Sequence, residues 1–262
     1  MGIFADPANL TWARRETKRQ NDLAVRKRLA TSIIKKGHFN CLSFPAASWI
    51  FEQDLCNSFS EIATFHFTGL EIDKEVFAKT FENAQKLDLP NGVFETTAEA
   101  RSLLQFLGTS NDPWSAGFKF DFVYADWMGT WNFDTKEAVR RMFVRKVIAH
   151  NGFLLITIML GRGTTVTLQE LDRYMIEDHF YEVLDLEEDP DEKTTQRMTD
   201  SAVGPLKVMG VTNLISSMAR QNGQDIRLVR MAIYDSQSVV NERITTPEIS
   251  LLYRVIHTQP ND

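Results

Sequence analysis

Two acidic residues of this 262-residue sequence directly follow short apolar segments. Glu71 follows EIATFHFTGL, residues 61–70, and Asp126 follows KFDFVYA, residues 119–125. The two oxygens of the Glu71 carboxylate can accept hydrogen bonds from a pair of neighbouring hydroxyls, such as those of a ribose. The Asp126 carboxylate can accept a proton or orient a nucleophile. These residues therefore predict a nucleotide-type ligand site in which one carboxylate binds the ligand and the other lies near the reacting atoms.

Two tryptophans lie close to Asp126 in the segment FDFVYADWMGTW, residues 120–131. Trp127 and Trp131 can stack on a planar substrate or keep water away from the reaction. Alternatively, both tryptophans are core residues and Asp126 only caps a turn, because Trp packs more often than it recognises a ligand. Glu71 has a similar alternative, as an exposed loop carboxylate next to a helix-capping Asp73.

Short apolar segments alternate with helical periodicity from Phe39 onward, which is typical of βαβ units and a parallel sheet. Strands are expected at residues 39–44, 61–70, 92–97, 119–125, 152–160, 179–186, 226–234 and 249–257. A helix is expected from Ala98 to Leu107, and Asp134 with Glu137 predicts a capping box for a helix that extends to His150. The predicted fold is α/β, a Rossmann-like doubly wound, mostly parallel sheet with an antiparallel carboxyl-terminal hairpin.

Ligands of open parallel sheets bind outside the carboxyl ends of the strands, where the strand order reverses. The residues expected at these ends are Phe44, Pro45, Ala46, Ala47 and Ser48 after the first strand, Glu71 after the second, Thr97 and Ala98 after the third, and Asp126 and Trp127 after the fourth.

This ordered series of motifs resembles the class I S-adenosylmethionine-dependent methyltransferases from roughly Phe39 to Leu160. The resemblance implies S-adenosylmethionine as the cofactor. It also implies that residues 44–48 approach the methionine part, that Glu71 binds the ribose, and that residues 97–98 lie near the adenine. Asp126 and Trp127 would lie where the substrate meets the methyl donor. The sequence departs from the family at residues 45–47, where glycines are usual, and at Ser43, where an acidic residue is common. It also lacks the tetrapeptide of amino-methyltransferases, which disfavours methylation of an exocyclic base nitrogen.

Positive charge is concentrated near the amino terminus, although the whole chain has a formal net charge of -6. The segment Trp12–Lys36 carries nine Lys or Arg residues against only Glu16 and Asp22. We interpret residues 1–36 as a basic helical arm that precedes a methyltransferase-type domain at residues 37–262. The candidate nucleic-acid-binding residues are Arg14, Arg15, Lys18, Arg19, Arg26 and Lys27. A solvated helix face is the alternative, because amphipathic basic helices are common.

Other kinds of site find little support in the sequence. No GxxxxGK[ST] phosphate loop is present, and the five histidines show no metal-ligand spacing, so no metal site is expected. The sequence has no run of about 18 apolar residues and no secretion signal, which predicts a cytoplasmic protein without membrane contact.

Three hypotheses therefore stay open. The first is an S-adenosylmethionine-dependent methyltransferase whose basic arm guides RNA or DNA. The second is an inactive methyltransferase-fold protein that binds nucleic acid or a protein partner. The third is an unrelated α/β enzyme that binds another nucleotide in the same crevice.

Overall fold

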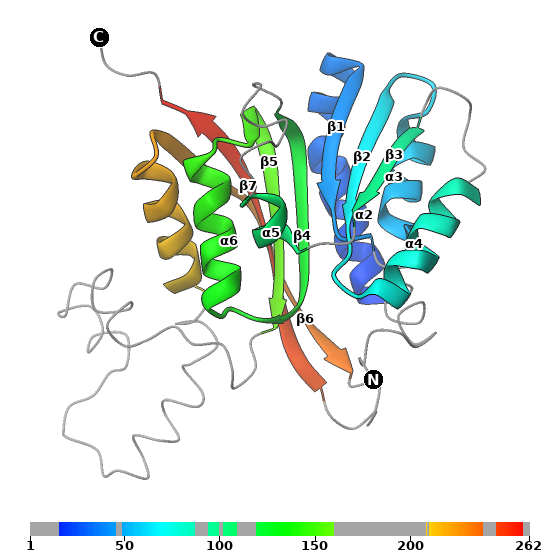
Figure 1. Cartoon of the computed structure of the whole chain (residues 1–262). Coiled ribbons are helices and arrows are strands. Elements are labelled where there is room, and N and C mark those ends of the chain that lie inside the picture. The colour runs from blue at the N-terminus through cyan, green and yellow to red at the C-terminus, as the bar shows by residue number, and fades with distance from the viewer. Residues whose placement is uncertain are drawn as a thin grey trace, which may run out of the picture.

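The protein folds around a single seven-stranded sheet (Figure 1). The computed structural model describes residues 16–45, 49–86, 94–99, 102–108, 119–159, 208, 210–237 and 245–258. Within these ranges the strand order is β3-β2-β1-β4-β5-β7-β6. The strands are β1 His38–Ser43, β2 Thr64–Leu70, β3 Phe94–Glu99, β4 Phe120–Thr130, β5 Ile148–Met159, β6 Gln224–Gln237 and β7 Thr245–His257.

The first five strands are parallel, and the last two add an antiparallel hairpin at one edge. The ladders that join β3, β2, β1, β4 and β5 are all parallel. Strand β7 is antiparallel to both β5 and β6. The predicted Rossmann-like fold and its carboxyl-terminal hairpin are therefore confirmed. The strand expected at 179–186 lies outside the described residues.

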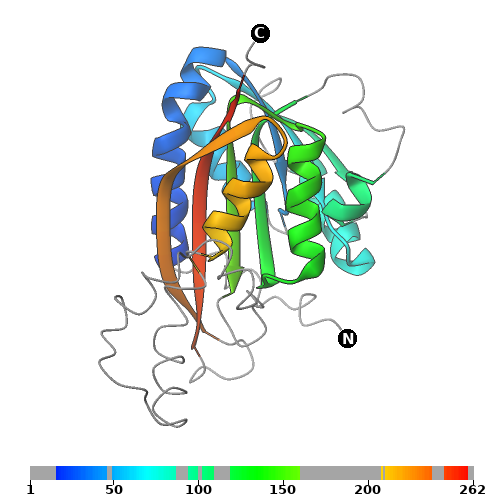
Figure 2. The ribbon, with the colours of Figure 1, turned by 90° about the vertical axis from the view of Figure 1, so that its left-hand side faces the viewer.

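Helices cover both faces of the sheet (Figure 2). They are α2 Glu16–Lys36, α3 Ile50–Phe59, α4 Lys74–Lys86, α5 Leu103–Phe106 and α6 Phe133–Val144, with a further helix over residues 210–220. Helices α2 and α3 pack on one face, whereas α5, α6 and the 210–220 helix pack on the other. The helix that connects β1 to β2 thus lies on one face of the sheet, and the helices before and after β4 lie on the other. This arrangement defines a doubly wound sheet.

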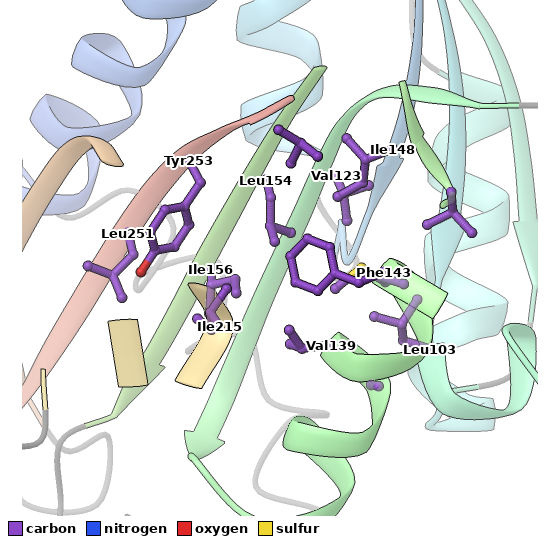
Figure 3. Close-up of a cluster of buried hydrophobic side chains, with 14 of the residues drawn as sticks. Leu103, Val123, Val139, Phe143, Ile148, Leu154, Ile156, Ile215, Leu251 and Tyr253 are labelled. Carbon is purple, nitrogen blue, oxygen red and sulfur yellow. The ribbon is translucent and has the colours of Figure 1, made fainter. Parts of the chain in front are cut away.

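The core is divided by the sheet into two apolar layers. On the α6 face, Phe143 packs with Leu154, Ile156 and Tyr253 (Figure 3). On the α2 face, Val25, Leu29 and Ile33 of α2 are completely buried against the strands. Because alternate strand residues point to opposite faces, strands β4 and β5 need apolar side chains at nearly every position. This requirement explains why both read as continuous apolar runs.

The helix expected from Ala98 starts later than predicted. Strand β3 continues to Glu99, so Ala98 lies in a strand, and helix α5 begins only after the capping box formed by Ser102 and Gln105. None of the helices described is both long enough and apolar enough to span a bilayer.

The expected capping box at Asp134 is also wrong. The Asn132 side chain caps helix α6 by accepting a hydrogen bond from the Thr135 N–H at 3.0 Å. The helix ends at Val144 rather than at His150, which lies in β5. Glu137 instead pairs with Arg140 and Arg141 on the helix surface.

Candidate active site

The candidate site lies at the carboxyl end of β1, where the sheet reverses its winding order. Strand β1 pairs with β2 on one side and with β4 on the other. The helix after β1, α3, covers one face, and the helix after β4, α6, covers the other. Such a reversal leaves the space beyond the end of β1 open between diverging connections, and this is where doubly wound sheets bind ligands.

The strand register brings Glu71 and Asp126 to the same level of the sheet. Ser43, the last residue of β1, pairs with Gly69 of β2 and with Tyr124 of β4. Glu71 and Asp126 each come two residues later in the chain. Because neighbouring strands are about 4.8 Å apart, strands β2 and β4, which lead to these two residues, lie roughly 10 Å apart on either side of β1. Two carboxylates therefore flank the predicted ligand position.

The Asp126 carboxylate is held in position by hydrogen bonds from the side chains of Lys18 and Tyr124. The ammonium of Lys18 donates to Asp126 Oδ2 at 2.8 Å and to the Tyr124 hydroxyl at 2.6 Å. The Tyr124 hydroxyl in turn donates to Asp126 Oδ2 at 3.1 Å. Asp126 Oδ1 is buried and has no hydrogen-bond partner among the residues described. One oxygen of the carboxylate is thus fixed, while the other can accept a hydrogen bond.

Trp127 does not share this position with Asp126, which corrects the expectation that the two act together. Strand β4 continues to Thr130, so the two residues are neighbours within a strand and point to opposite faces. Asp126 faces α2, whereas Trp127 packs on the α6 face, edge to face with Phe44 at 5.6 Å between ring centroids. Trp131 is completely buried in the core, as its alternative interpretation predicted.

Lys18 is buried, which contradicts the expectation that its side chain contacts nucleic acid at the surface. Its side chain is 6% exposed and forms an ion pair with Asp126. Arg26 pairs with Asp54 at 3.2 Å, while Arg19 and Lys27 are exposed on the outer side of α2. The roles proposed for Arg14 and Arg15 lie outside the described residues. Residues 16–36 therefore form a helix packed on the sheet, in which Lys18 is buried while the exposed cations are Arg19, Lys27, Arg28, Lys35 and Lys36.

Glu71 lies at the turn between β2 and α4. Its Oε1 accepts a hydrogen bond from the Asp73 N–H at 2.9 Å, and burial raises the pKa of its carboxyl. Asp73 caps α4 by accepting hydrogen bonds from the N–H groups of Glu75 and Val76. The capping role of Asp73 is confirmed. The turn fixes the position of Glu71, whose carboxylate has further lone pairs for a ligand.

The turn after β1 is closed by a tryptophan that the sequence did not single out. Trp49 has a left-handed backbone with φ 51°, is completely buried, and donates from its indole to the Thr80 carbonyl at 2.9 Å. A Cβ on Gly69 would lie 2.6 Å from the Trp49 ring and 3.0 Å from Pro45. Position 69 of the neighbouring strand β2 therefore requires a glycine, because any side chain there would collide with the Trp49 ring. Of the predicted cofactor turn, residues 46–48 lie outside the described chain.

Thr97 and Ala98 lie within β3 and not beyond it. They pair with Thr68 and Gly69 of β2. In the β2 register, Ala98 thus lies two residues before the level of Glu71 and Thr97 lies three residues before it. Their proposed contact with the adenine stays a prediction.

Sequence reasoning missed two buried carboxyls beneath this edge. Asp22 of α2 is 5% exposed and Glu52 of α3 is 2% exposed. Burial raises the pKa of Asp22 to about 6 and that of Glu52 to about 7. One signal was available for α2, since positions 18 and 22 extend the buried stripe of Val25, Leu29 and Ile33 at helical spacing.

No family model and no curated protein matches this sequence. Among solved structures, the magnesium protoporphyrin IX methyltransferase from Synechocystis PCC 6803 with bound SAM is similar at 13% identity, with a TM-score of 0.48, over 97% of this chain and 93% of that chain. A SAM-dependent methyltransferase from Methanosarcina mazei is similar at 12% identity, with a TM-score of 0.44, over 88% of this chain and 98% of that one. The cyclopropane synthase from Mycobacterium tuberculosis is similar at 11% identity, with a TM-score of 0.48, over 93% of this chain and 88% of that one.

Proposed function

We propose that this protein is an S-adenosylmethionine-dependent methyltransferase whose site lies between Glu71 and Asp126. The observation that carries the proposal is the pair of carboxylates at one level on either side of the β1 end, at the point where the sheet reverses its winding. The resemblance of the motif order to class I methyltransferases supports the same cofactor.

The chemistry of the donor set fits this cofactor. The ribose of S-adenosylmethionine presents two neighbouring hydroxyls, and the Glu71 carboxylate can accept from both. The amino group of the cofactor's methionine part presents N–H donors. Asp126 Oδ1 is a buried acceptor without a partner in the described part of the chain. The two carboxylates thus match donors at separate ends of the cofactor.

The residues of this chain act mainly by placing the reactants. Bound S-adenosylmethionine supplies a methyl group on a positively charged sulfur. Phe44 and Trp127 form an apolar pair beside the site on the α6 face, which helps to exclude water. Asp126 provides a fixed negative charge that orients N–H or O–H donors. Positioning of this kind accounts for a large part of the acceleration of a bimolecular displacement.

Calorimetric titration with S-adenosylmethionine and S-adenosylhomocysteine tests this proposal. We expect both ligands to bind the unmodified protein, and Glu71→Ala to weaken binding by about tenfold or more, because it removes a charged acceptor. Glu75→Ala is the matched control, since Glu75 is an exposed carboxylate in the first turn of α4. Absence of heat from both ligands would favour the inactive alternative, and equal binding by Glu71→Ala would remove the ribose assignment.

We further propose a nucleic acid as the methyl acceptor, guided by the exposed cations of α2. Arg19 and Lys27 support this proposal because they are exposed on the helix that contributes Lys18 to the site. RNA or DNA binding should weaken with salt, and the double change Arg19→Gln with Lys27→Gln should reduce the salt slope by about two. Lys74→Gln on α4 is the control. Salt-independent binding, or an unchanged slope, would leave α2 as a solvated or protein-facing helix.

A further inference from the structure

A buried polar cluster lies under the first turns of α2, on the face of the sheet opposite Trp127. Helix α2 contributes Lys18 and Asp22, α3 contributes Glu52, and β4 contributes Tyr124 and Asp126. Four of the five are at most 5% exposed, and the Asp126 side chain is 13% exposed. Polar groups are rarely buried in such number without a role, because each has a desolvation cost.

Lys18 is the member that fixes the others. It donates to Tyr124 and to Asp126, and its ammonium lies 5.3 Å from the centre of the Tyr124 ring. Helix α2 cannot easily shift, because its buried apolar stripe packs on the sheet and Lys36 near its end pairs with Asp121 at the start of β4. Asp126 Oδ2 is therefore held in one place by a rigid element.

The cluster holds more acidic than basic groups. Lys18 is the single cation among these five residues, against the carboxyls of Asp22, Glu52 and Asp126. Arg26 lies near Asp22 but pairs with Asp54. Asp22 Oδ1 and Asp126 Oδ1 are both buried without a hydrogen-bond partner in the described ranges. A buried excess of acceptors and negative charge is complemented by a cation that carries N–H donors.

We infer that Lys18, together with Tyr124, is a positioning residue that turns Asp126 Oδ1 toward the amino group of the cofactor's methionine part. The inference rests on the proposed function and adds a role for the amino-terminal helix, which becomes a wall of the site. No atom of Lys18 needs to touch the ligand. The role predicts that Lys18 affects only ligands that carry the amino group.

Two ligands separate this role from a general structural one. S-adenosylhomocysteine carries the amino acid end, whereas 5′-methylthioadenosine lacks it and keeps the adenosine. In calorimetric titrations of the full chain, Lys18→Met should weaken S-adenosylhomocysteine about ten- to hundredfold. The affinity for 5′-methylthioadenosine should change less than about twofold, within the scatter of such measurements. Lys18→Arg should recover part of the loss, because it restores a charged donor.

Further variants guard against an unfolded Lys18→Met protein. Tyr124→Phe removes one of the two groups that hold Asp126 Oδ2 and keeps the ring in the core, so it should weaken S-adenosylhomocysteine several-fold and 5′-methylthioadenosine little. Arg28→Met, at an exposed position of the same helix, should change the affinity for neither ligand.

Three outcomes would overturn the inference. If the unmodified protein binds neither ligand, the proposed function fails and the inference fails with it. If the unmodified protein binds both but Lys18→Met and Tyr124→Phe weaken both ligands equally, the role of Lys18 is structural. If both variants bind S-adenosylhomocysteine normally, Lys18 does not position Asp126 for the ligand.

Discussion

At the scale of single residues, the segment after β1 is stabilised by the packing of Trp49 against Gly69 of the neighbouring strand β2. Trp49 adopts a left-handed backbone, which costs a bulky residue about 1–2 kcal/mol. Burial of the whole indole and its hydrogen bond to the Thr80 carbonyl offset that cost. The ring fits only because Gly69 has no side chain. Trp49 and the glycine on the next strand thus pack together beside the end of β1.

Substitution of Gly69 tests this arrangement. Gly69→Ala should lower the free energy of unfolding by about 1–3 kcal/mol, because the new Cβ collides with the Trp49 ring. Trp49→Phe removes the colliding atoms, so Gly69→Ala should cost much less in that background. Urea denaturation of the four proteins of this double-mutant cycle measures the coupling. Additive effects would mean that the two side chains do not compete for one space.

Glu52 predicts a dependence of stability on pH. Burial raises the pKa of Glu52 to about 7 in the folded chain, from an ordinary value of 4.5. Folding therefore favours the protonated carboxyl, and the stability that Glu52 contributes is present at low pH and is lost as the pH rises through about 7.

Glu52→Gln stays neutral and should gain stability over the unmodified protein as the pH rises. The gain between about pH 5 and about pH 8 should be on the order of 3 kcal/mol. Urea denaturation at the two pH values measures it. An identical difference between the two proteins at both pH values would contradict a raised pKa at this carboxyl.

Some residues of the candidate site can be predicted from sequence and others cannot, for a physical reason. Glu71 and Asp126 were predictable because each directly follows an apolar run whose end is visible. The partnership of Lys18 with Asp126 was not, because it joins residues 108 positions apart. The many positive charges of this segment suggested that Lys18 faces solvent. Its actual environment depends on which side of α2 packs on the sheet.

At the scale of elements, helix α2 is a structural layer and not an appended arm. Val25, Leu29 and Ile33 are completely buried against the strands, and the two ends of the helix are paired with Asp126 and Asp121 of β4. The packing of this helix therefore stabilises the sheet and also places Lys18 beside Asp126. Loss of its apolar contacts should unfold the chain as a whole.

Leu29→Ala tests the contribution of α2. It should lower the free energy of unfolding by about 2–5 kcal/mol, because it leaves a cavity under a completely buried side chain. Leu23→Ala is the matched control on the same helix, since Leu23 is 45% exposed, and its effect should stay within about 0.5 kcal/mol. Chemical denaturation measures both. Equal small effects would mean that α2 is a detachable arm.

Strands were predictable as elements, but several boundaries were not. The apolar runs of β4 and β5 located both central strands, since buried parallel strands are apolar at nearly every position. The start of α6 was misplaced because Asn132 and Asp134 are both good caps, and only the backbone path decides between them. Strand β4 extends past Asp126 because its partner β5 offers pairing as far as Met159.

At the scale of the whole molecule, the strand order places the proposed cofactor site at the carboxyl ends of the parallel strands. The parallel strands all end toward the site that Glu71 and Asp126 flank, and α2 begins at the same end, as the contact between Lys18 and Asp126 requires. The antiparallel hairpin of β6 and β7 forms one lateral edge of the sheet. A cofactor bound at the carboxyl ends of the parallel strands should leave the other end of the sheet unaffected.

Hydrogen–deuterium exchange with and without S-adenosylhomocysteine tests this placement directly. The account predicts slower exchange on ligand binding in the segments around Ser43, Glu71 and Asp126 and in the first turn of α2. It predicts no change around His150 and His257, which lie together at the opposite end. Slower exchange around those histidines, or no change in any segment at saturating ligand, would contradict a cofactor site at the carboxyl end of β1.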